Sequence, residues 1–185
     1  MTDSPAPIYP LLPYPGASRG AVRRLDVRIE MAADRTLRLD YVLETDLQHV
    51  RIPPAVRGGG RAERLWMHTC FEAFVAGDDS PGYLELNFSP SGQWAAYRFE
   101  SYRQGMAAAE LAADPHLQVR QSARELELQA TVRVASRERI RLGLSAVVED
   151  DEGGLSYWAL RHPPGRPDFH HPDSFSLALE PSPSP

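Results

Sequence analysis

The stretch Leu25-Asp26-Val27-Arg28-Ile29-Glu30-Met31 alternates apolar with charged side chains, and Leu37-Arg38-Leu39-Asp40-Tyr41-Val42-Leu43 largely repeats the alternation. A period of two is typical of β-strands that bury one face and leave the other in water, as strands of antiparallel sheets do. The intervening Ala32-Ala33-Asp34-Arg35 has the length and polarity of a hairpin loop. Residues 125–134 alternate in the same way. These three segments therefore predict half-buried antiparallel strands.

A second group of segments carries large side chains on both faces, which is typical of central strands in a sandwich. These segments are residues 66–76, 82–89, 93–99, 142–149 and 155–160. One alanine-rich stretch, residues 104–113, predicts a short helix that Asp114-Pro115 ends. We therefore expect an all-β fold, an antiparallel β-sandwich of the jelly-roll or immunoglobulin-like kind with one short helical insertion.

The chain has 185 residues, a length that suits one domain with one core. Five of its seventeen prolines lie within the first fifteen residues and three within the last five, so both ends are poor candidates for regular structure. We predict a Pro-rich arm over residues 1–20, a ligand-binding sandwich over residues 21–179 and a disordered tail over residues 180–185. The long connection over residues 45–64 is typical of a binding loop or of disorder.

Composition excludes several classes of protein. All twenty basic residues are arginines, so no lysine can form a Schiff base or hold a phosphate in a P-loop. The single cysteine, Cys70, excludes an internal disulfide and a cysteine-rich zinc site. The net charge of −5 argues against nucleic-acid binding, and no apolar run approaches the ~20 residues of a membrane helix. Because residues 1–16 do not resemble a signal peptide, we expect a cytoplasmic protein.

Alternation assigns polar side chains to one face of the central strands. In the first of these strands, this face carries Trp66, His68, Cys70, Glu72 and Phe74. In the later strands it carries Tyr83, Glu85 and Asn87, and then Gly143, Ser145, Val147 and Glu149. The opposite faces are apolar. A sheet with one dry face and one face of carboxylates, an amide and aromatic rings is suited to binding a small ligand.

Carbohydrate is the ligand class that these residues favour. Carboxylates and amides hydrogen-bond sugar hydroxyls, while flat aromatic rings cover the C–H faces of a sugar ring. The expected hydroxyl-binding residues are Glu72, Glu85 and Asn87, with His68 and Glu149 as peripheral polar candidates. The expected stacking residues are Trp94 and Trp158, with Tyr97 and Tyr157 as further aromatic candidates. In the alternative interpretation the carboxylates face bulk water and the aromatic side chains belong to the core.

Other functions stay open at this point. Glu72 and Glu85 on neighbouring strands could serve as the acid and nucleophile of a glycosidase. A proline-rich segment carries four candidate ligands for haem or a divalent metal: His162, Asp168, His170 and His171. The same segment could simply close one end of the sandwich. We expect a non-catalytic protein without a cofactor, whose partner is a small molecule, a sugar first of all, and neither a nucleic acid nor a membrane.

Several blocks of sequence resemble a known family. They are Leu65-Trp66-Met67-His68-Thr69-Cys70-Phe71-Glu72-Ala73-Phe74, Tyr83-Leu84-Glu85-Leu86-Asn87-Phe88-Ser89-Pro90-Ser91-Gly92-Gln93-Trp94, Ser156-Tyr157-Trp158-Ala159-Leu160 and Pro167-Asp168-Phe169-His170-His171. They look like the bacterial DOMON-like domain proteins, a likeness that covers the chain except for its Pro-rich ends. The shared pattern is carried by Trp66, Glu72, Glu85, Asn87, Ser89, Pro90 and Gly92.

This resemblance implies a β-sandwich related to family 9 carbohydrate-binding modules and to haem- or sugar-binding DOMON domains. It implies a ligand on the concave sheet and no enzymatic activity. Haem-binding DOMON domains use a methionine and a histidine as axial ligands. For those positions the chain offers Met67 and Met106, beside His68 or His162.

Overall fold

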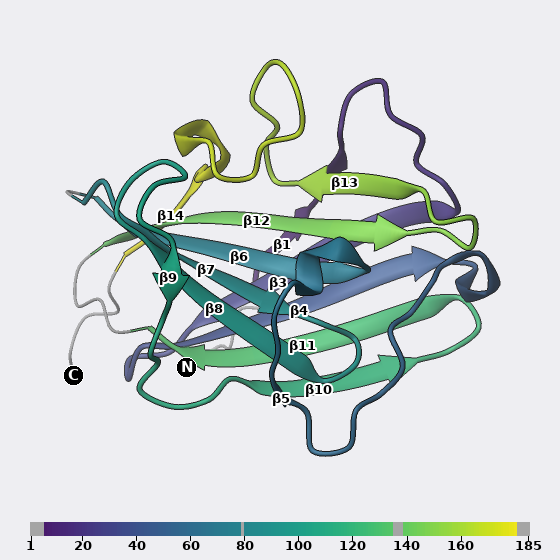
Figure 1. Ribbon diagram of the computed structural model, residues 1–185, viewed down its shortest axis with the longest axis horizontal. Coiled ribbons are helices and arrows are strands. Elements are labelled where there is room, and N and C mark those ends of the chain that lie inside the picture. The colour runs from purple at the N-terminus through teal and green to yellow at the C-terminus, as the bar shows by residue number, and fades with distance from the viewer. Residues whose placement is uncertain (1–5, 79, 135–138, 181–185) are drawn as a thin grey trace.

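The computed structural model describes residues 6–78, 80–134 and 139–180, which fold into two packed β-sheets (Figure 1). All strand pairs are antiparallel except one short parallel pair between β5 and β8. The predicted all-β antiparallel sandwich is confirmed. No helix in the described ranges is long and apolar enough to cross a membrane.

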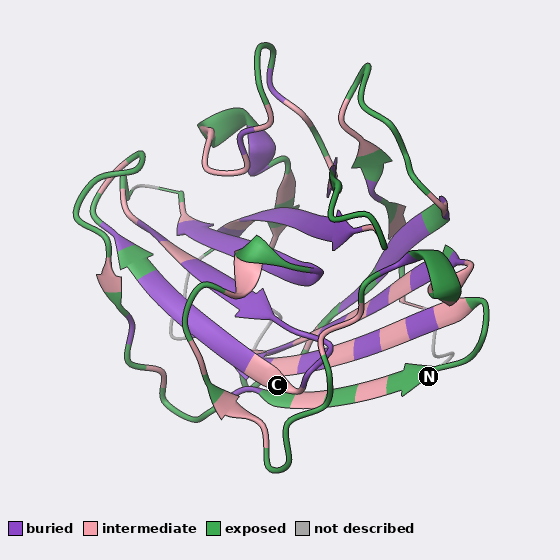
Figure 2. Ribbon diagram, turned by 45° about the vertical axis from the view of Figure 1, so that its right-hand side comes forward, coloured by how far each residue is buried: buried purple, intermediate pink, exposed green. Residues whose placement is uncertain are grey.

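The smaller sheet has five strands in the order β1-β3-β4-β11-β10. Their bounds are β1 Ile8–Pro10, β3 Val22–Met31, β4 Thr36–Thr45, β11 Glu125–Arg133 and β10 His116–Gln121. The alternating segments that opened the sequence form the hairpin of β3 and β4, with Ile29 opposite Leu39. Buried and partly exposed positions alternate along β4 and β11, because one face packs on the core and the other meets water (Figure 2).

The larger sheet has nine strands, seven of them in the order β2-β13-β12-β6-β7-β8-β5. Their bounds are β2 Leu12–Pro13, β13 Leu155–Ala159, β12 Ile140–Glu149, β6 Cys70–Gly77, β7 Tyr83–Phe88, β8 Gln93–Phe99 and β5 Gly60–Arg61. The short strands β14, Leu177–Leu179, and β9, Ala107–Ala108, pair with β12 and β8. The central strands β6 and β12 are buried almost throughout (Figure 2). Other segments of the chain must therefore cover their outer face, which is the face turned away from the smaller sheet.

The hydrophobic core lies between the two sheets. On β6, Phe71, Ala73 and Val75 belong to this core, while the next residues along, Glu72 and Phe74, lie on the outer face. The Tyr41 ring of β4 packs on Phe71 with ring centroids 5.0 Å apart, and its hydroxyl donates a hydrogen bond of 2.9 Å to the backbone carbonyl of Glu72. This contact ties the smaller sheet to the middle of the larger one.

The predicted helix over residues 104–113 is wrong. Ala107 and Ala108 form β9, which pairs with Arg98 and Tyr97 on β8, and the rest of the segment is turn and loop. Pairing with a sheet edge therefore outweighs the helix propensity of alanine, which is only a weak preference. Within the described ranges the helical segments are three 3₁₀ turns: η1 Leu47–His49, η2 Leu65–Met67 and η3 Pro172–Ser174.

The N-terminal arm is also more regular than its prolines predict. It enters both sheets, since β1 pairs with β3 and β2 pairs with β13, and Leu11 between them is buried in the core. Pro10 and Pro13 fit there because both lie in short edge strands, where a missing N–H costs no central hydrogen bond. Of the predicted tail, residues 181–185 lie outside the described ranges.

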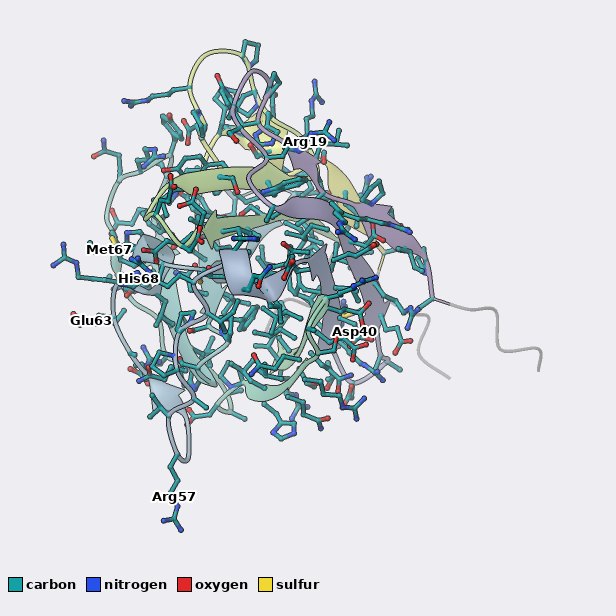
Figure 3. All side chains as sticks on the ribbon, turned by 90° about the vertical axis from the view of Figure 1, so that its right-hand side faces the viewer. Arg19, Asp40, Arg57, Glu63, Met67 and His68 are labelled. Carbon is teal, nitrogen blue, oxygen red and sulfur yellow. The ribbon has the colours of Figure 1, made fainter. Side chains whose placement is uncertain are left out.

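The long connection over residues 45–64 is hydrogen-bonded to the sandwich. The Val56 N–H donates to the Ser91 carbonyl at 2.8 Å, and Thr69 Oγ1 donates to the Arg51 carbonyl at 2.7 Å. Gly59 has φ +58°, and a Cβ there would meet the Gly92 carbonyl oxygen at 2.4 Å, so the close approach requires glycine. Arg57 extends away from the body at the tip of this connection (Figure 3).

The core assignment predicts a large stability loss for Phe71→Ala. Phe71 is fully buried against Tyr41, so truncation leaves a cavity that should lower the free energy of unfolding by about 3–5 kcal/mol, measured by urea denaturation. Val56→Ala, in the connection described above, should change it by less than about 0.5 kcal/mol. Equal small effects from both variants would contradict the assignment of Phe71 to the core.

Candidate ligand-binding site

The outer face of the larger sheet brings together polar side chains from three neighbouring strands. In the strand register Ser145 of β12 lies opposite Glu72 of β6, which lies opposite Asn87 of β7. One row along, Phe74 lies opposite Glu85. Glu72 and Glu85 are therefore diagonal neighbours on adjacent strands, close enough for their charges to interact.

A pocket of about 560 Å³ opens above these residues. Its lining is Trp66, Met67, Glu72, Phe74, Glu85, Phe99, Arg103, Met106, Val147, Leu155, Tyr157, Pro167, Phe169 and His170. This volume lies within the range of ordinary small-molecule sites, which are mostly apolar with a few polar groups. The two glutamates lie on the sheet that forms the floor, and the aromatic side chains come from both the sheet and the segments around it.

One wall of the pocket is the segment that follows β13, which passes over the outer face (Figure 1). The His170 and Phe175 rings pack edge-on against Phe74 at centroid distances of 5.1 and 5.9 Å. Gly143 of β12 lets this segment come close, since a Cβ there would meet the Ser174 carbonyl oxygen at 3.1 Å. The segment thus covers one end of the sheet and leaves the rest open as the pocket.

Asp168 anchors this wall to the turn after β8. Its carboxylate accepts hydrogen bonds from the Tyr102 hydroxyl at 2.5 Å, from Arg103 Nη2 at 2.8 Å and from the His170 N–H at 3.2 Å. Burial opposes ionisation, but the bonds from Tyr102 and Arg103 outweigh it and hold the pKa of Asp168 below its ordinary value. The carboxylate and Arg103 therefore form a charged pair that fixes the position of the wall.

The opposite side of the pocket is formed by η2, just before β6. The Trp66 ring meets Tyr97 edge-on at a centroid distance of 5.5 Å. Met67 and Met106 are about half exposed at the rim, and Met67 lies beside His68 at the edge of the molecule (Figure 3). The predicted strand over residues 66–76 begins only at Cys70, so the turn of η2, and not strand alternation, places Trp66 at the pocket.

Both carboxylates of the floor are buried and hydrogen-bonded on one oxygen. Ser145 Oγ donates to Glu72 Oε2 at 2.9 Å, and Asn87 Nδ2 donates to Glu85 Oε1 at 2.7 Å. The other end of the same amide, Asn87 Oδ1, is buried without a hydrogen-bond partner among the described residues. A buried acceptor without a donor is costly, so the floor holds unsatisfied hydrogen-bonding capacity.

Burial changes the protonation of this pair. It raises the pKa of Glu72 to about 8, with the neighbouring Glu85 adding to the rise and the Ser145 hydrogen bond opposing it. Burial also raises the pKa of Glu85, against the lowering effects of the Asn87 hydrogen bond and Arg103. The two carboxyl groups therefore retain a proton at neutral pH, because two like charges in a poorly solvated floor repel one another.

His170 is neutral at pH 7 and is held by contacts on both ring nitrogens' sides. Burial lowers its pKa to about 4, with Arg103 adding to the effect. The Tyr83 hydroxyl shares a hydrogen bond of 2.8 Å with His170 Nδ1, and its oxygen accepts the Arg103 N–H at 3.2 Å. His170 Nε2 lies 3.8 Å from Glu85 Oε2, beyond hydrogen-bond distance.

The two tryptophans expected to stack on a ligand do not lie in the pocket. Trp94 shares its strand face with Phe88, which lies opposite it, and Trp158 lies opposite Ala146, so both point into the core. They are 3% and 2% exposed. Arg61 covers the Trp94 ring from the edge of the sheet at 4.6 Å. The expected stacking role is therefore wrong for both tryptophans. The alternation of side chains along their strands also places both on the core-facing side of the sheet.

His68 and Glu149 form a separate cluster next to the pocket. Glu149 is buried and pairs with His68 Nδ1 at 2.7 Å and with Arg51 Nη1 at 2.6 Å. Neither residue lines the pocket. They fix the connection over residues 45–64 against the end of β12, which gives them a structural role in this arrangement.

The four candidate metal ligands are not brought together as a set. His162 bonds the Leu12 carbonyl at 2.8 Å, and His171 Nδ1 accepts the Asp173 N–H at the start of η3. Asp168 and His170 have the partners described above. No group of three or more histidine, cysteine, aspartate or glutamate side chains in the described ranges has metal-binding geometry.

No protein-family model and no curated protein sequence matches this chain. Among solved structures, a Bacteroides uniformis protein provisionally assigned as carbohydrate-binding superposes with a TM-score of 0.67 at 15% identity, over 91% of this chain and 83% of that chain. A family 9 carbohydrate-binding module from Caldicellulosiruptor kristjanssonii in complex with cellotriose gives a TM-score of 0.54 at 9% identity, over 86% of this chain and 75% of that chain. Its complex with glucose gives 0.52 at 9% identity, with coverages of 86% and 76%.

At these identities the likeness defines the fold. The chain has the β-sandwich fold of family 9 carbohydrate-binding modules and of the Bacteroides protein. The predicted relation to such modules is confirmed at the level of the fold, whereas the narrower resemblance to DOMON-like domain proteins stays a prediction.

The buried floor predicts a distinctive pH dependence of stability. Because the pKa of Glu72 is about 8 in the folded protein and 4.5 ordinarily, the unfolded chain ionises first as pH rises. Stability should therefore fall between pH 5 and pH 8. Glu72→Gln cannot ionise, so its denaturation midpoint should fall less over this range and exceed that of the native protein at pH 8. Glu110→Gln, at an exposed position, should follow the native curve. Parallel curves for Glu72→Gln and the native protein would contradict a raised pKa.

Proposed function

We propose that this protein binds a carbohydrate in the pocket on the outer face of its larger sheet. The observation that carries the proposal is the floor of the pocket: two buried carboxyl groups, Glu72 and Glu85, surrounded by aromatic rings and backed by the buried amide of Asn87. A polyol supplies what this floor lacks, since each hydroxyl can donate one hydrogen bond and accept another.

The walls suit the apolar faces of a sugar ring. Trp66, Tyr157 and Phe169 line the pocket and are only partly buried, so their rings offer accessible surface. Aromatic rings of this kind cover the C–H faces of sugars, while polar groups fix the orientation of the hydroxyls. The protonation of the floor fits the same role, because a protonated Glu72 can donate to a ligand oxygen and Glu85 can accept from a ligand hydroxyl.

The structural neighbours support the same ligand class. The Caldicellulosiruptor module is bound to cellotriose in one structure and to glucose in another. The resemblance to DOMON-like domain proteins also implies a sugar or haem ligand without enzymatic activity. The protein acts, in this proposal, as a non-catalytic binding domain whose partner is a small saccharide.

A glycosidase is the second candidate, because one observation favours it. A general acid must keep its proton at neutral pH, and the pKa of Glu72 is raised to about 8. Hydrolysis of chromogenic glycosides that is lost in Glu72→Gln would establish this activity and replace the non-catalytic proposal. Binding without hydrolysis across a broad glycoside panel would retain the proposal.

Ligand binding should raise the melting temperature. A sugar at one hundred times its dissociation constant adds about 2.7 kcal/mol, which corresponds to a shift on the order of 5–10 °C for a domain of this size. Glucose and cellotriose are the first sugars to test, with haemin and divalent metal ions in the same panel. A shift with haemin or a metal ion and with no sugar would overturn the proposal in favour of the histidines.

Variants at two aromatic residues locate the site. Tyr157→Ala removes a ring that lines the pocket and should weaken sugar binding by about tenfold in titration calorimetry. Trp94→Phe changes a ring buried between the sheets and should lower stability while leaving the sugar affinity unchanged. The reverse result, with affinity lost in Trp94→Phe and kept in Tyr157→Ala, would place the sugar elsewhere.

A further inference from the structure

The floor of the pocket is rich in hydrogen-bond acceptors and poor in donors. Asn87 Oδ1 has no donor, and Glu85 Oε2 has only His170 Nε2 at 3.8 Å. The Glu72 carboxyl group accepts its hydrogen bond, from Ser145 Oγ, on Oε2. None of the described residues donates to its other oxygen, Oε1. Once both carboxyl groups are ionised, Glu72 Oε1 and Glu85 Oε2 are therefore two acceptor atoms that no described side chain satisfies, on two residues that line the pocket.

The charges around the floor are also unbalanced. Two carboxyl groups, those of Glu72 and Glu85, and one guanidinium, that of Arg103, line the pocket. Arg103 is paired with Asp168 at 2.8 Å, and His170 beside them is neutral. No described arginine or histidine forms an ion pair with Glu72, and the chain contains no lysine. Glu72 thus has no cation as a partner, and Arg103 acts on Glu85 only at a distance, while it is paired with Asp168.

We propose that the ligand is an amino sugar, whose protonated amine binds between Glu72 and Glu85. This inference rests on the proposed function and names the substrate class of the same pocket. An ammonium group brings a positive charge and hydrogen-bond donors, which match the missing charge and the free oxygens Glu72 Oε1 and Glu85 Oε2. A neutral sugar satisfies the acceptors through its hydroxyls but leaves the negative charge that remains on the pair without a counter-charge.

The aromatic rings around the floor favour a cation as well. Phe74, Phe99 and Tyr157 lie on strands of the sheet, and Trp66 and Phe169 come from the segments around it. The face of an aromatic ring attracts an ammonium group, most strongly where water is excluded. The same rings contact the C–H groups of the sugar, so the pocket can hold the charged and apolar parts of one molecule at once.

Binding of the amine is linked to a proton. The pair of glutamates retains a proton at neutral pH, and a bound ammonium displaces it to the buffer, since the positive charge favours the ionised form of both groups. The ionisable groups around the pair are Tyr41, Cys70, Tyr83, Tyr97, Arg103, Asp168 and His170. Burial raises the pKa values of the three tyrosines and the cysteine, so none of these four competes for the proton at neutral pH.

Three β-1,4-linked trisaccharides that differ at C2 test the inference. Cellotriose has a hydroxyl there, chitotriose with free amines has an ammonium, and its fully acetylated form has a neutral amide. In titration calorimetry at pH 7 the free-amine trisaccharide should bind at least about tenfold more tightly than the other two, a difference of about 1.4 kcal/mol. Its affinity should rise from pH 5 to pH 6, where the sugar amines stay protonated, and its binding at pH 6 should release a proton, detected as different heats in phosphate and MES buffers. Tris is avoided because it is itself a primary amine.

The variant Glu85→Gln tests whether the charge of the site, and not its shape, causes the preference for the amine. The amide keeps the size of the side chain and removes its negative charge, so the preference for the free-amine trisaccharide should fall to within about twofold while cellotriose still binds. Asp26→Asn is the matched control, because it neutralises a buried carboxylate of the smaller sheet that does not line the pocket. The control should keep the full preference.

The outcomes distinguish the two proposals. Cellotriose or the acetylated trisaccharide binding as tightly as the free-amine form would overturn the amino-sugar inference and leave carbohydrate binding intact. No binding of any of the three, with no shift of the melting temperature by glucose, would overturn the proposed function and this inference together. A preference for the amine that persists in Glu85→Gln would show that these carboxylates do not cause it and would likewise overturn the inference.

Discussion

Because side chains alternate along a strand, the hydrogen-bond register that turns Phe71 into the core also turns Glu72 out of it. A shift of one residue would bury the carboxylate between the sheets and expose the phenylalanine. Tyr41 stabilises the observed register from the other sheet, since its ring packs on Phe71 and its hydroxyl bonds the Glu72 carbonyl. The position of β6 therefore determines both the packing of the sandwich and the chemistry of the pocket floor.

The buried glutamates lower the stability of the protein, and their partners reduce that cost only in part. Ser145 and Asn87 each satisfy one carboxylate oxygen. Only a proton or a ligand can satisfy the remaining acceptors and reduce the repulsion between the two carboxyl groups. Groups that raise the free energy of the unliganded protein in this way are typical of binding sites, where the bound ligand lowers that free energy again.

Much of the fold could be predicted from the sequence, because alternation is a local signal that every strand repeats. The hairpin of β3 and β4 and the segments of β7, β8, β11, β12 and β13 lie where the pattern placed them, within a few residues. The same signal brought Glu72, Glu85 and Asn87 to one face. The alternation of β8 and β13 turns Trp94 and Trp158 inward, opposite Phe88 and Ala146. A local pattern says nothing about η2 or β9, whose structure depends on contacts with distant segments.

The walls of the pocket depend on contacts that no local pattern encodes. Phe169 and His170 reach the floor only because Asp168 is bonded to Tyr102 and Arg103, more than sixty residues earlier in the chain, and because Gly143 admits the Ser174 carbonyl. That anchoring has a chemical consequence. Arg103 is the one described arginine that lines the pocket, and its pairing with Asp168 balances its charge there. The interaction that builds the wall thus also holds Arg103 against Asp168, so the shape of the pocket and the balance of charge along its lining depend on the same ion pair.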